Sequence, residues 1–284
     1  MNDVNKVPAS AGAQWLLDGF ATLRKAPLGL GLLGVIYGAL SLLVGSTIGN
    51  TGVFMALQVL MLLVGPLLMG GFMFAVHNVD AGGTAVPAHL LEGFRAGRAG
   101  RLLATLLPNI AAALVCVLLL FVMVGPQAVT EMVQAVEQAS AQAAPDPAMI
   151  ASWPIGRLML WLLLSFLVAL TASFFTFIAT PQIMFGEDGA FQAMGRSFRA
   201  SVRNLPALIV FLVLALIAMF AIYIAVIVLG FAVKMLAGPV AMQVTTQLLS
   251  MAVMMPVLVG AIHAAWRQLL GAGVAVPVSA GFEA

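Results

Sequence analysis

The stretch from Leu102 to Val124 reads LLATLLPNIAAALVCVLLLFVMV and contains no Asp, Glu, Lys or Arg. A helix of this length crosses the hydrocarbon of a bilayer, which needs about 20 apolar residues. Five further runs of the chain have the same character, and the breaks between the runs carry Gly, Pro, Asn and the charged residues. The six predicted transmembrane helices are 27–48, 53–76, 102–124, 155–180, 206–230 and 243–265.

The composition of the whole chain agrees with this interpretation. Of its 284 residues, 63% are hydrophobic and 8% are charged, whereas a soluble domain carries about 25% charged residues to face water. Its one cysteine, Cys116, lies inside an apolar run and can form no internal disulfide. We therefore expect an all-α, polytopic membrane protein, with residues 1–284 forming a single membrane domain.

The basic residues predict the orientation of the helices. Arg157 and Lys234 fall on one side of the predicted membrane, and the other ten Lys and Arg fall on the opposite side. The side richer in Lys and Arg faces the cytoplasm, so both termini are predicted to be cytoplasmic. The ten residues are Lys6, Arg24, Lys25, Arg95, Arg98, Arg101, Arg196, Arg199, Arg203 and Arg267.

The longest connection on the outer side, residues 125–154, contains acidic residues and no Lys or Arg. Its first part, Gln127–Gln142, is rich in Ala and Gln and predicts a helix on the outer surface. Pro145, Pro147 and Pro154 would end that helix and return the chain to the membrane.

An internal repeat organises the sequence. Residues 16–20 read LLDGF and residues 90–94 read LLEGF. The tripeptide Val-Pro-Ala stands upstream of each, at 7–9 and at 86–88, and a third version of the block, GRSF, occupies 195–198. Each copy begins an amphipathic cytoplasmic segment followed by a helical hairpin, and an even number of spans keeps successive repeats parallel in the membrane. Kinks are expected at equivalent prolines, Pro66, Pro181 and Pro256. The predicted repeats are 7–80, 85–188 with an outer insertion at 125–154, and 190–270, followed by a C-terminal tail at 271–284.

The amphipathic segments are predicted to lie in the headgroup plane of the cytoplasmic leaflet. Their basic residues would meet anionic lipid headgroups, and their aromatic rings would enter the acyl boundary. The alternative is that these charges only fix the topology. The basic candidates are Arg24, Lys25, Arg95, Arg98, Arg101, Arg196, Arg199 and Arg203, and the interfacial aromatics are Trp15, Phe20, Phe94 and Phe198.

Motifs for chemistry are sparse. Residues 29–34 read GLGLLG, but no strand precedes them, so a dinucleotide site is not expected. His77, His89 and His263 lack carboxylates at ligand spacing, which argues against a metal site. Asp80 is interpreted as part of a turn. We expect no catalytic residue, no cofactor, no metal and no nucleic-acid partner, and the lack of a central ionisable residue argues against an ion-driven pump.

Residues 190–199, AFQAMGRSFR, continue through Asn204 into the fifth predicted span. This stretch resembles a feature of uncharacterised bacterial six-helix inner-membrane proteins. Those proteins are loosely similar to the membrane domain attached to some glycerophosphodiester phosphodiesterases. The resemblance implies a bacterial inner membrane, and no phosphodiesterase activity follows from it because the chain has no such catalytic domain.

The sequence favours a non-enzymatic integral protein of the bacterial inner membrane that acts through lipid or protein contacts. Envelope maintenance, an accessory-subunit role and protection against a membrane-targeting toxin all fit that description. A facilitator or transporter of a small or lipidic solute is the alternative, and a polar central cavity would favour it. The sequence does not specify a protein partner or a homo-oligomer.

Overall fold

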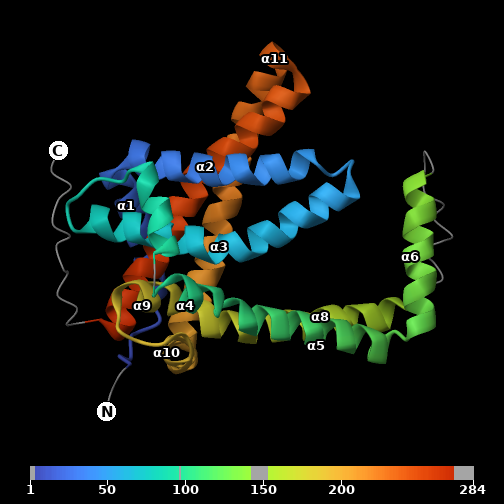
Figure 1. Cartoon of the computed structure of the whole chain (residues 1–284), viewed down its shortest axis with the longest axis horizontal. Helices are drawn as coiled ribbons and strands as arrows, with labels where there is room; N and C mark the ends of the chain where they lie inside the picture. Colours follow the sequence, from blue (N-terminus) through green and yellow to red (C-terminus); the bar gives the residue numbers. More distant parts are fainter. Residues whose placement is uncertain (1–3, 96, 142–152, 272–284) are drawn as a thin grey trace. The chain divides into compact units, whose positions relative to one another are not determined.

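The computed structural model describes residues 4–95, 97–141 and 153–271, and the regular structure in these ranges is helical (Figure 1). The chain divides into two compact units: unit 1 comprises Met1–Thr105 and Thr176–Ala284, and unit 2 comprises Leu106–Phe175. The predicted C-terminal tail after Gly271 and the middle of the outer insertion lie outside the described residues. In the part that is described, five helices are long and apolar enough to cross a membrane: Pro27–Ser46, Thr51–Asp80, Ala99–Met123, Ile155–Phe185 and Leu205–Leu270.

Unit 1 begins with three helices, α1 (Ala11–Lys25), α2 (Pro27–Ser46) and α3 (Thr51–Asp80). Pro27 starts α2, where its missing N–H and fixed φ suit a first helical turn. A short turn then leads to Asn50, whose side-chain Oδ1 accepts a hydrogen bond from the Val53 N–H at 3.1 Å and caps α3. The result is an antiparallel pair, α2 and α3, as predicted for the first hairpin (Figure 1).

The long helix α11 (Leu205–Leu270) reverses direction at Gly238, where φ is 85° and ψ is 179°. A straight helix of 66 residues would extend about 100 Å. Instead, Asn5 binds near both ends of α11: its N–H donates to the Leu269 carbonyl at 2.8 Å, and its carbonyl accepts from the Asn204 amide at 2.9 Å. The two arms of α11, 205–237 and 239–270, therefore fold back on each other as a helical hairpin.

Four short elements complete unit 1. They are the 3₁₀ helix η1 (Pro87–Phe94) and the α-helices α4 (Ala99–Leu103), α9 (Ala179–Phe185) and α10 (Ala190–Arg203). Together with α1, the elements η1 and α10 contain the three amphipathic segments that the repeat predicts. The second segment differs from the other two, since it forms a 3₁₀ helix and not an α-helix.

Prolines determine where two of the predicted spans are interrupted. A proline clashes with the carbonyl four residues earlier and cannot donate a helical hydrogen bond. Pro108 follows the break between α4 and the next helix at Ala104, and Pro181 follows the break before α9 at Ile178. Pro66 and Pro256, in contrast, lie inside α3 and α11 without ending them.

The core of unit 1 forms where α2, α3, η1 and α11 meet. Large side chains from these elements are almost fully enclosed, among them Leu33 of α2, Phe72 of α3 and Val259 of α11, each at most 1% exposed. A second group of buried side chains joins α3 to α4, α9 and α10: Leu67, Leu102, Ile183, Met184 and Ala193.

Glycine permits the closest helix contacts in unit 1. A Cβ on Gly19 of α1 would lie 2.2 Å from the Val257 carbonyl oxygen of α11, and a Cβ on Gly93 of η1 would lie 1.9 Å from the Leu67 carbonyl oxygen of α3. Neither position has room for a side chain. These are the equivalent glycines of the LLDGF and LLEGF blocks, and each contacts the residue that follows Pro256 or Pro66.

The third block makes a related contact through a hydroxyl group. In the third block, Ser197 of α10 stands at the position that glycine occupies in LLDGF and LLEGF. Ser197 is fully buried and accepts a hydrogen bond from the Ile178 N–H at 3.1 Å. Ile178 immediately precedes α9, the helix that contains Pro181. Each amphipathic segment therefore packs on a stretch of helix that carries one of the three predicted kink prolines.

Unit 2 contains the helices α5 (Leu106–Met123), α6 (Pro126–Ala141) and α8 (Ile155–Thr176). The indole N–H of Trp161 in α8 donates to the Cys116 carbonyl of α5 at 2.9 Å, so the two apolar helices run side by side (Figure 1). Gly125, with a φ of 91°, separates α5 from α6. Helix α6 covers most of the segment for which a helix is predicted in the outer insertion.

We expect Gly19→Ala to lower the stability of the protein, because the added methyl group would overlap the backbone of α11. Overpacking of this kind costs about 1–3 kcal/mol, which thermal unfolding in detergent would detect. Gly195→Ala in α10 is the matched control, since no atom lies within 4 Å of its added Cβ. That variant should be neutral or gain about 0.5–1 kcal/mol from reduced chain entropy. Equal melting temperatures for the two variants would contradict the close packing.

Candidate functional site

The main concentration of charge in unit 1 lies where the ends of three helices meet. Asp80, the last residue of α3, receives the Lys25 ammonium on Oδ1 at 2.7 Å and the Arg267 guanidinium on Oδ2. Lys25 ends α1, and Arg267 lies in the last turn of α11. The Asp80 side chain is 14% exposed, whereas the two cations are about half exposed. The carboxylate is thus held between two basic groups at the edge of the bundle.

Two histidines lie directly behind this carboxylate. Nδ1 of His77 is 3.0 Å from Nε2 of His263, and the His263 side chain is 3% exposed. One of the two nitrogens must donate and the other accept, so the bond requires at least one neutral ring. Nδ1 of His263 is 3.9 Å from Asp80 Oδ2. We call these five residues, Lys25, His77, Asp80, His263 and Arg267, the Asp80 cluster.

Aromatic rings separate the Asp80 cluster from a second polar group. The Phe185 ring stacks on His77 with a centroid distance of 4.1 Å and contacts the Trp266 ring at 5.4 Å. The Trp266 indole then donates to Gln182 Oε1 at 2.7 Å. Polar and aromatic contacts consequently run without interruption from α3 through α11 to α9.

The second polar group is built around Asp188, in the turn between α9 and α10. Its Oδ2 accepts from Gln182 Nε2 at 2.7 Å and pairs with Arg196 at 2.9 Å, and its carbonyl accepts from Arg101 at 3.1 Å. Asp188 is buried, and both of the cations come from predicted cytoplasmic segments. Unit 1 is thus crossed at this end by a polar layer that joins α1, α3, α4, α9, α10 and α11.

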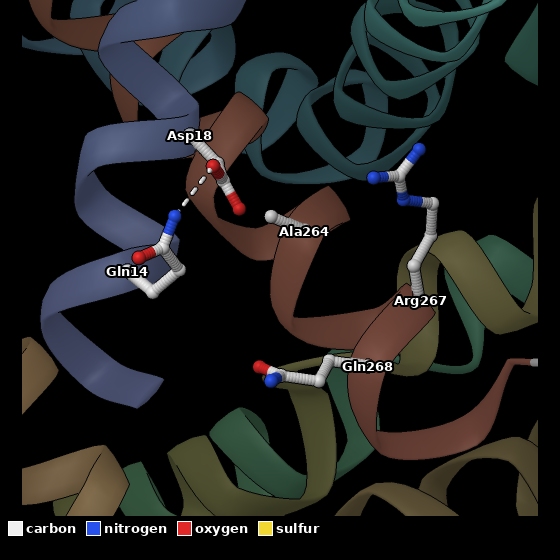
Figure 2. A pocket seen from close by; sticks show the side chains of 5 residues that line it. All are labelled: Gln14, Asp18, Ala264, Arg267 and Gln268. Atoms are coloured by element: carbon white, nitrogen blue, oxygen red, sulfur yellow. Dashed lines mark hydrogen bonds between the residues drawn. The ribbon is translucent and has the colours of Figure 1, made fainter. Parts of the chain in front are cut away.

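Two adjoining cavities open beside the Asp80 cluster between α1 and α11. The larger, about 300 Å³, is lined by Gln14, Asp18, Ala264, Arg267 and Gln268 (Figure 2). The smaller, about 120 Å³, shares Asp18, Ala264 and Arg267 with it and extends toward Lys25, Asp80 and His263. Charged and amide groups on both helices therefore face a common space, which is large enough for a small polar ligand.

His89 occupies a different position, on η1. Its ring packs edge-on against Phe74 at a centroid distance of 5.2 Å, and Nδ1 accepts a long hydrogen bond from the Val86 N–H at 3.4 Å. Partial burial lowers the pKa of His89 below the usual value for histidine, opposed in part by the neighbouring Glu92 carboxylate. This histidine therefore favours its neutral form near neutral pH.

The structure brings some of the predicted basic residues into ion pairs and leaves others at the surface. Lys25 and Arg196 pair with Asp80 and Asp188, and Arg95 pairs with Glu92 at 2.9 Å. Arg101 and Arg199 donate to backbone carbonyls, those of Asp188 and Gly195 respectively. The side chains of Arg24 and Arg203 are exposed, and Arg98 is partly exposed.

The predicted interfacial aromatic residues differ in how far the fold buries them. Trp15 is 1% exposed, packs between Phe177 and Phe211, and donates from its indole nitrogen to Gln268. Its ring packs inside unit 1 and is almost fully enclosed, whereas the sequence predicts an interfacial position for it. Phe94 is 42% exposed and Phe20 is partly exposed, so both have a surface to offer the acyl region. Phe198 also has an interaction partner within the fold.

No local pattern in the sequence assigns His77, His263 and Asp80 to a common site. The two histidines are 186 positions apart, and the residues around Asp80 predict a turn. All three residues fall near the cytoplasmic ends of predicted spans, and this shared position could have suggested that they lie at one end of the bundle. That placement alone does not reveal which side chains meet.

Comparison of the chain with protein-family models, with curated proteins and with solved structures finds no match.

We expect Asp80→Asn to destabilise unit 1, because it leaves Lys25 and Arg267 beside each other without their shared anion. Both cations are about half exposed, so solvent screens the interaction and the loss should be about 1 kcal/mol. The measurement is thermal unfolding in detergent at low and high salt, with Glu187→Gln, an exposed carboxylate of unit 1, as the control. A loss that did not shrink at high salt would show that the interaction is not mainly electrostatic.

Proposed function

We propose that this chain is a non-enzymatic protein of the bacterial inner membrane that crosses the bilayer six times, has both termini in the cytoplasm, and acts through contacts with lipids. The observation that carries the proposal is the combination of outward-facing apolar helices with charged helix ends that meet at one edge of unit 1. The first feature supports apolar surroundings for the helices, and the second supports a polar surface at one end of them.

The apolar surroundings follow from the exposed side chains. No residue of α5, all of which is described, is buried, and Leu114, Leu118 and Val122 are 63–73% exposed. In unit 1, Leu216, Phe220 and Val228 of α11 are similarly exposed. Contiguous apolar surface of this extent is not tolerated in water. In a bilayer, lipid acyl chains would cover this surface and keep its apolar side chains out of water.

The orientation is supported by the contacts of the Asp80 cluster. The start of α2, the end of α3 and the end of α11 lie together there, so the basic residues beside them share one side of unit 1. Lys234 lies instead near the reversal at Gly238, at the far end of the α11 arms. By the positive-inside rule the Asp80 cluster faces the cytoplasm.

Six crossings require that each arm of α11 spans the bilayer. Arms 205–237 and 239–270 are each longer than the about 20 residues that a span needs. With α2, α3, the α4–α5 segment and the α8–α9 segment, they give the six predicted spans.

The three-repeat arrangement is supported by the pattern of segment contacts. The segment of the first repeat packs on α11 beside Pro256, that of the second on α3 beside Pro66, and that of the third next to α9, which contains Pro181. Each segment thus contacts the second arm of the preceding hairpin, and the first segment contacts the last hairpin. A closed cycle of this kind is expected of three equivalent units around an axis along the membrane normal.

Cysteine labelling tests the topology. In a chain with Cys116→Ser, we expect Pro239→Cys and Ser140→Cys to react with a membrane-impermeant maleimide in intact spheroplasts. Gly97→Cys should react only after the membrane is opened, because it lies between η1 and α4 on the side of the Asp80 cluster. Reaction of Gly97→Cys in sealed cells would overturn the orientation, and protection of Pro239→Cys would overturn the crossing by the two arms of α11.

A further inference from the structure

The cavity between α1 and α11 presents opposite charges on opposite walls. Figure 2 shows the Asp18 carboxylate on α1 directed into the cavity and the Arg267 side chain across it on α11. Gln14 and Gln268 add amide groups, which can both donate and accept hydrogen bonds. The site therefore offers one pole for a cation and one for an anion within about 300 Å³.

The anionic pole is available for a ligand. Asp18 Oδ1 accepts a weak, exposed hydrogen bond from Gln14 at 3.3 Å. Within the described ranges, no Lys, Arg or His lies at ion-pair distance from its carboxylate. Asp18 is nevertheless only partly exposed and lines both cavities. A carboxylate in this position can accept charge-assisted hydrogen bonds from an entering ammonium group.

The cationic pole has capacity beyond the ion pair with Asp80. Arg267 uses one nitrogen, Nη1, for Asp80, and its guanidinium has further N–H donors. Lys25 likewise has more donors than its single bond to Asp80 requires, and both side chains are about half exposed. Two cations share one carboxylate, which leaves a net positive charge to meet an anion.

The charges of Lys25, Arg267, Asp80 and Asp18 sum to zero over the walls of the two adjoining cavities. A neutral sum with separated poles suits a zwitterion better than an anion, because a simple phosphate would be attracted by Arg267 and repelled by Asp18. The Asp80 cluster lies at the headgroup level in the proposed topology, where zwitterionic lipid headgroups are abundant. We propose that this cavity binds the phosphoethanolamine headgroup of a membrane lipid.

In the bound state, the headgroup ammonium donates hydrogen bonds to Asp18, and the phosphate accepts them from Arg267 and Lys25. The ammonium needs N–H donors for its contact, so a trimethylated choline headgroup, which has none, is bound less well. Lipids with uncharged glycerol in place of the amine lack the group that Asp18 recognises. The inference rests on the proposed membrane topology, which places lipid beside α1 and the end of α11.

Calorimetric titration of the full chain in detergent micelles tests the proposal with short-chain lipids that differ only in headgroup. We expect the ethanolamine lipid to bind about tenfold more tightly than the choline lipid, the effect of one charge-assisted hydrogen-bonding group. Asp18→Asn, which keeps the shape of the side chain, should abolish that preference. Glu187→Gln removes a carboxylate outside the cavity lining and should preserve it.

Several outcomes would overturn the proposal. These are equal affinity for the ethanolamine, choline and glycerol lipids, or a preference for ethanolamine that persists in Asp18→Asn. Water-soluble glycerophosphoethanolamine binding as tightly as the lipid would assign the site to a free solute instead. Asp18→Glu, which keeps the charge, should retain part of the preference if the variant folds. Cysteine labelling tests the topology independently of lipid binding. If the labelling pattern is as expected but the preference for the ethanolamine headgroup is absent, only this inference is rejected.

Discussion

Direct contact between glycine-containing segments and neighbouring helix backbones is the constraint on which the rest of unit 1 depends. Where Gly19 meets Val257 and Gly93 meets Leu67, no side chain separates the two backbones. Such contacts bring α1 directly against α11 and η1 directly against α3. Because α1 ends in Lys25, its packing also brings that ammonium group within reach of Asp80 at the end of α3.

The polar layer follows from that placement. Once α1 lies against α11, Lys25 and Arg267 both reach Asp80, and the Trp15 indole reaches Gln268. The same layer contains a histidine pair, the buried His263 and the partly buried His77, whose hydrogen bond requires at least one neutral ring. Few charged groups are present in the chain, and those near this edge are used in specific pairs. The remaining donors and the Asp18 carboxylate surround the cavity.

The sequence could predict the helices but not how their ends meet. Long runs without charge predicted an all-helical fold with six spans, because charged groups are costly to bury in hydrocarbon. The described residues contain five helices that are long and apolar enough to cross a membrane. The repeat of LLDGF and LLEGF indicated equivalent segments, but their periodicity could not show that Trp15 faces inward. That outcome depends on Phe177 and Phe211, which approach only in the folded chain. The His77–His263 pair escaped prediction for the same reason, since neither residue has a local pattern that marks its partner.

The hydrogen bonds of Asn5 have a consequence for the order of assembly. Asn5 precedes its partner Asn204 by 199 residues, and its other partner, Leu269, is synthesised later still. Helix α1 faces the same delay, because its groove is formed by the closing arms of α11. Contacts of such long sequence separation form late, since chain closure must precede them. Asn5 and helix α1 therefore reach their final positions only after the two arms of α11 have folded against each other.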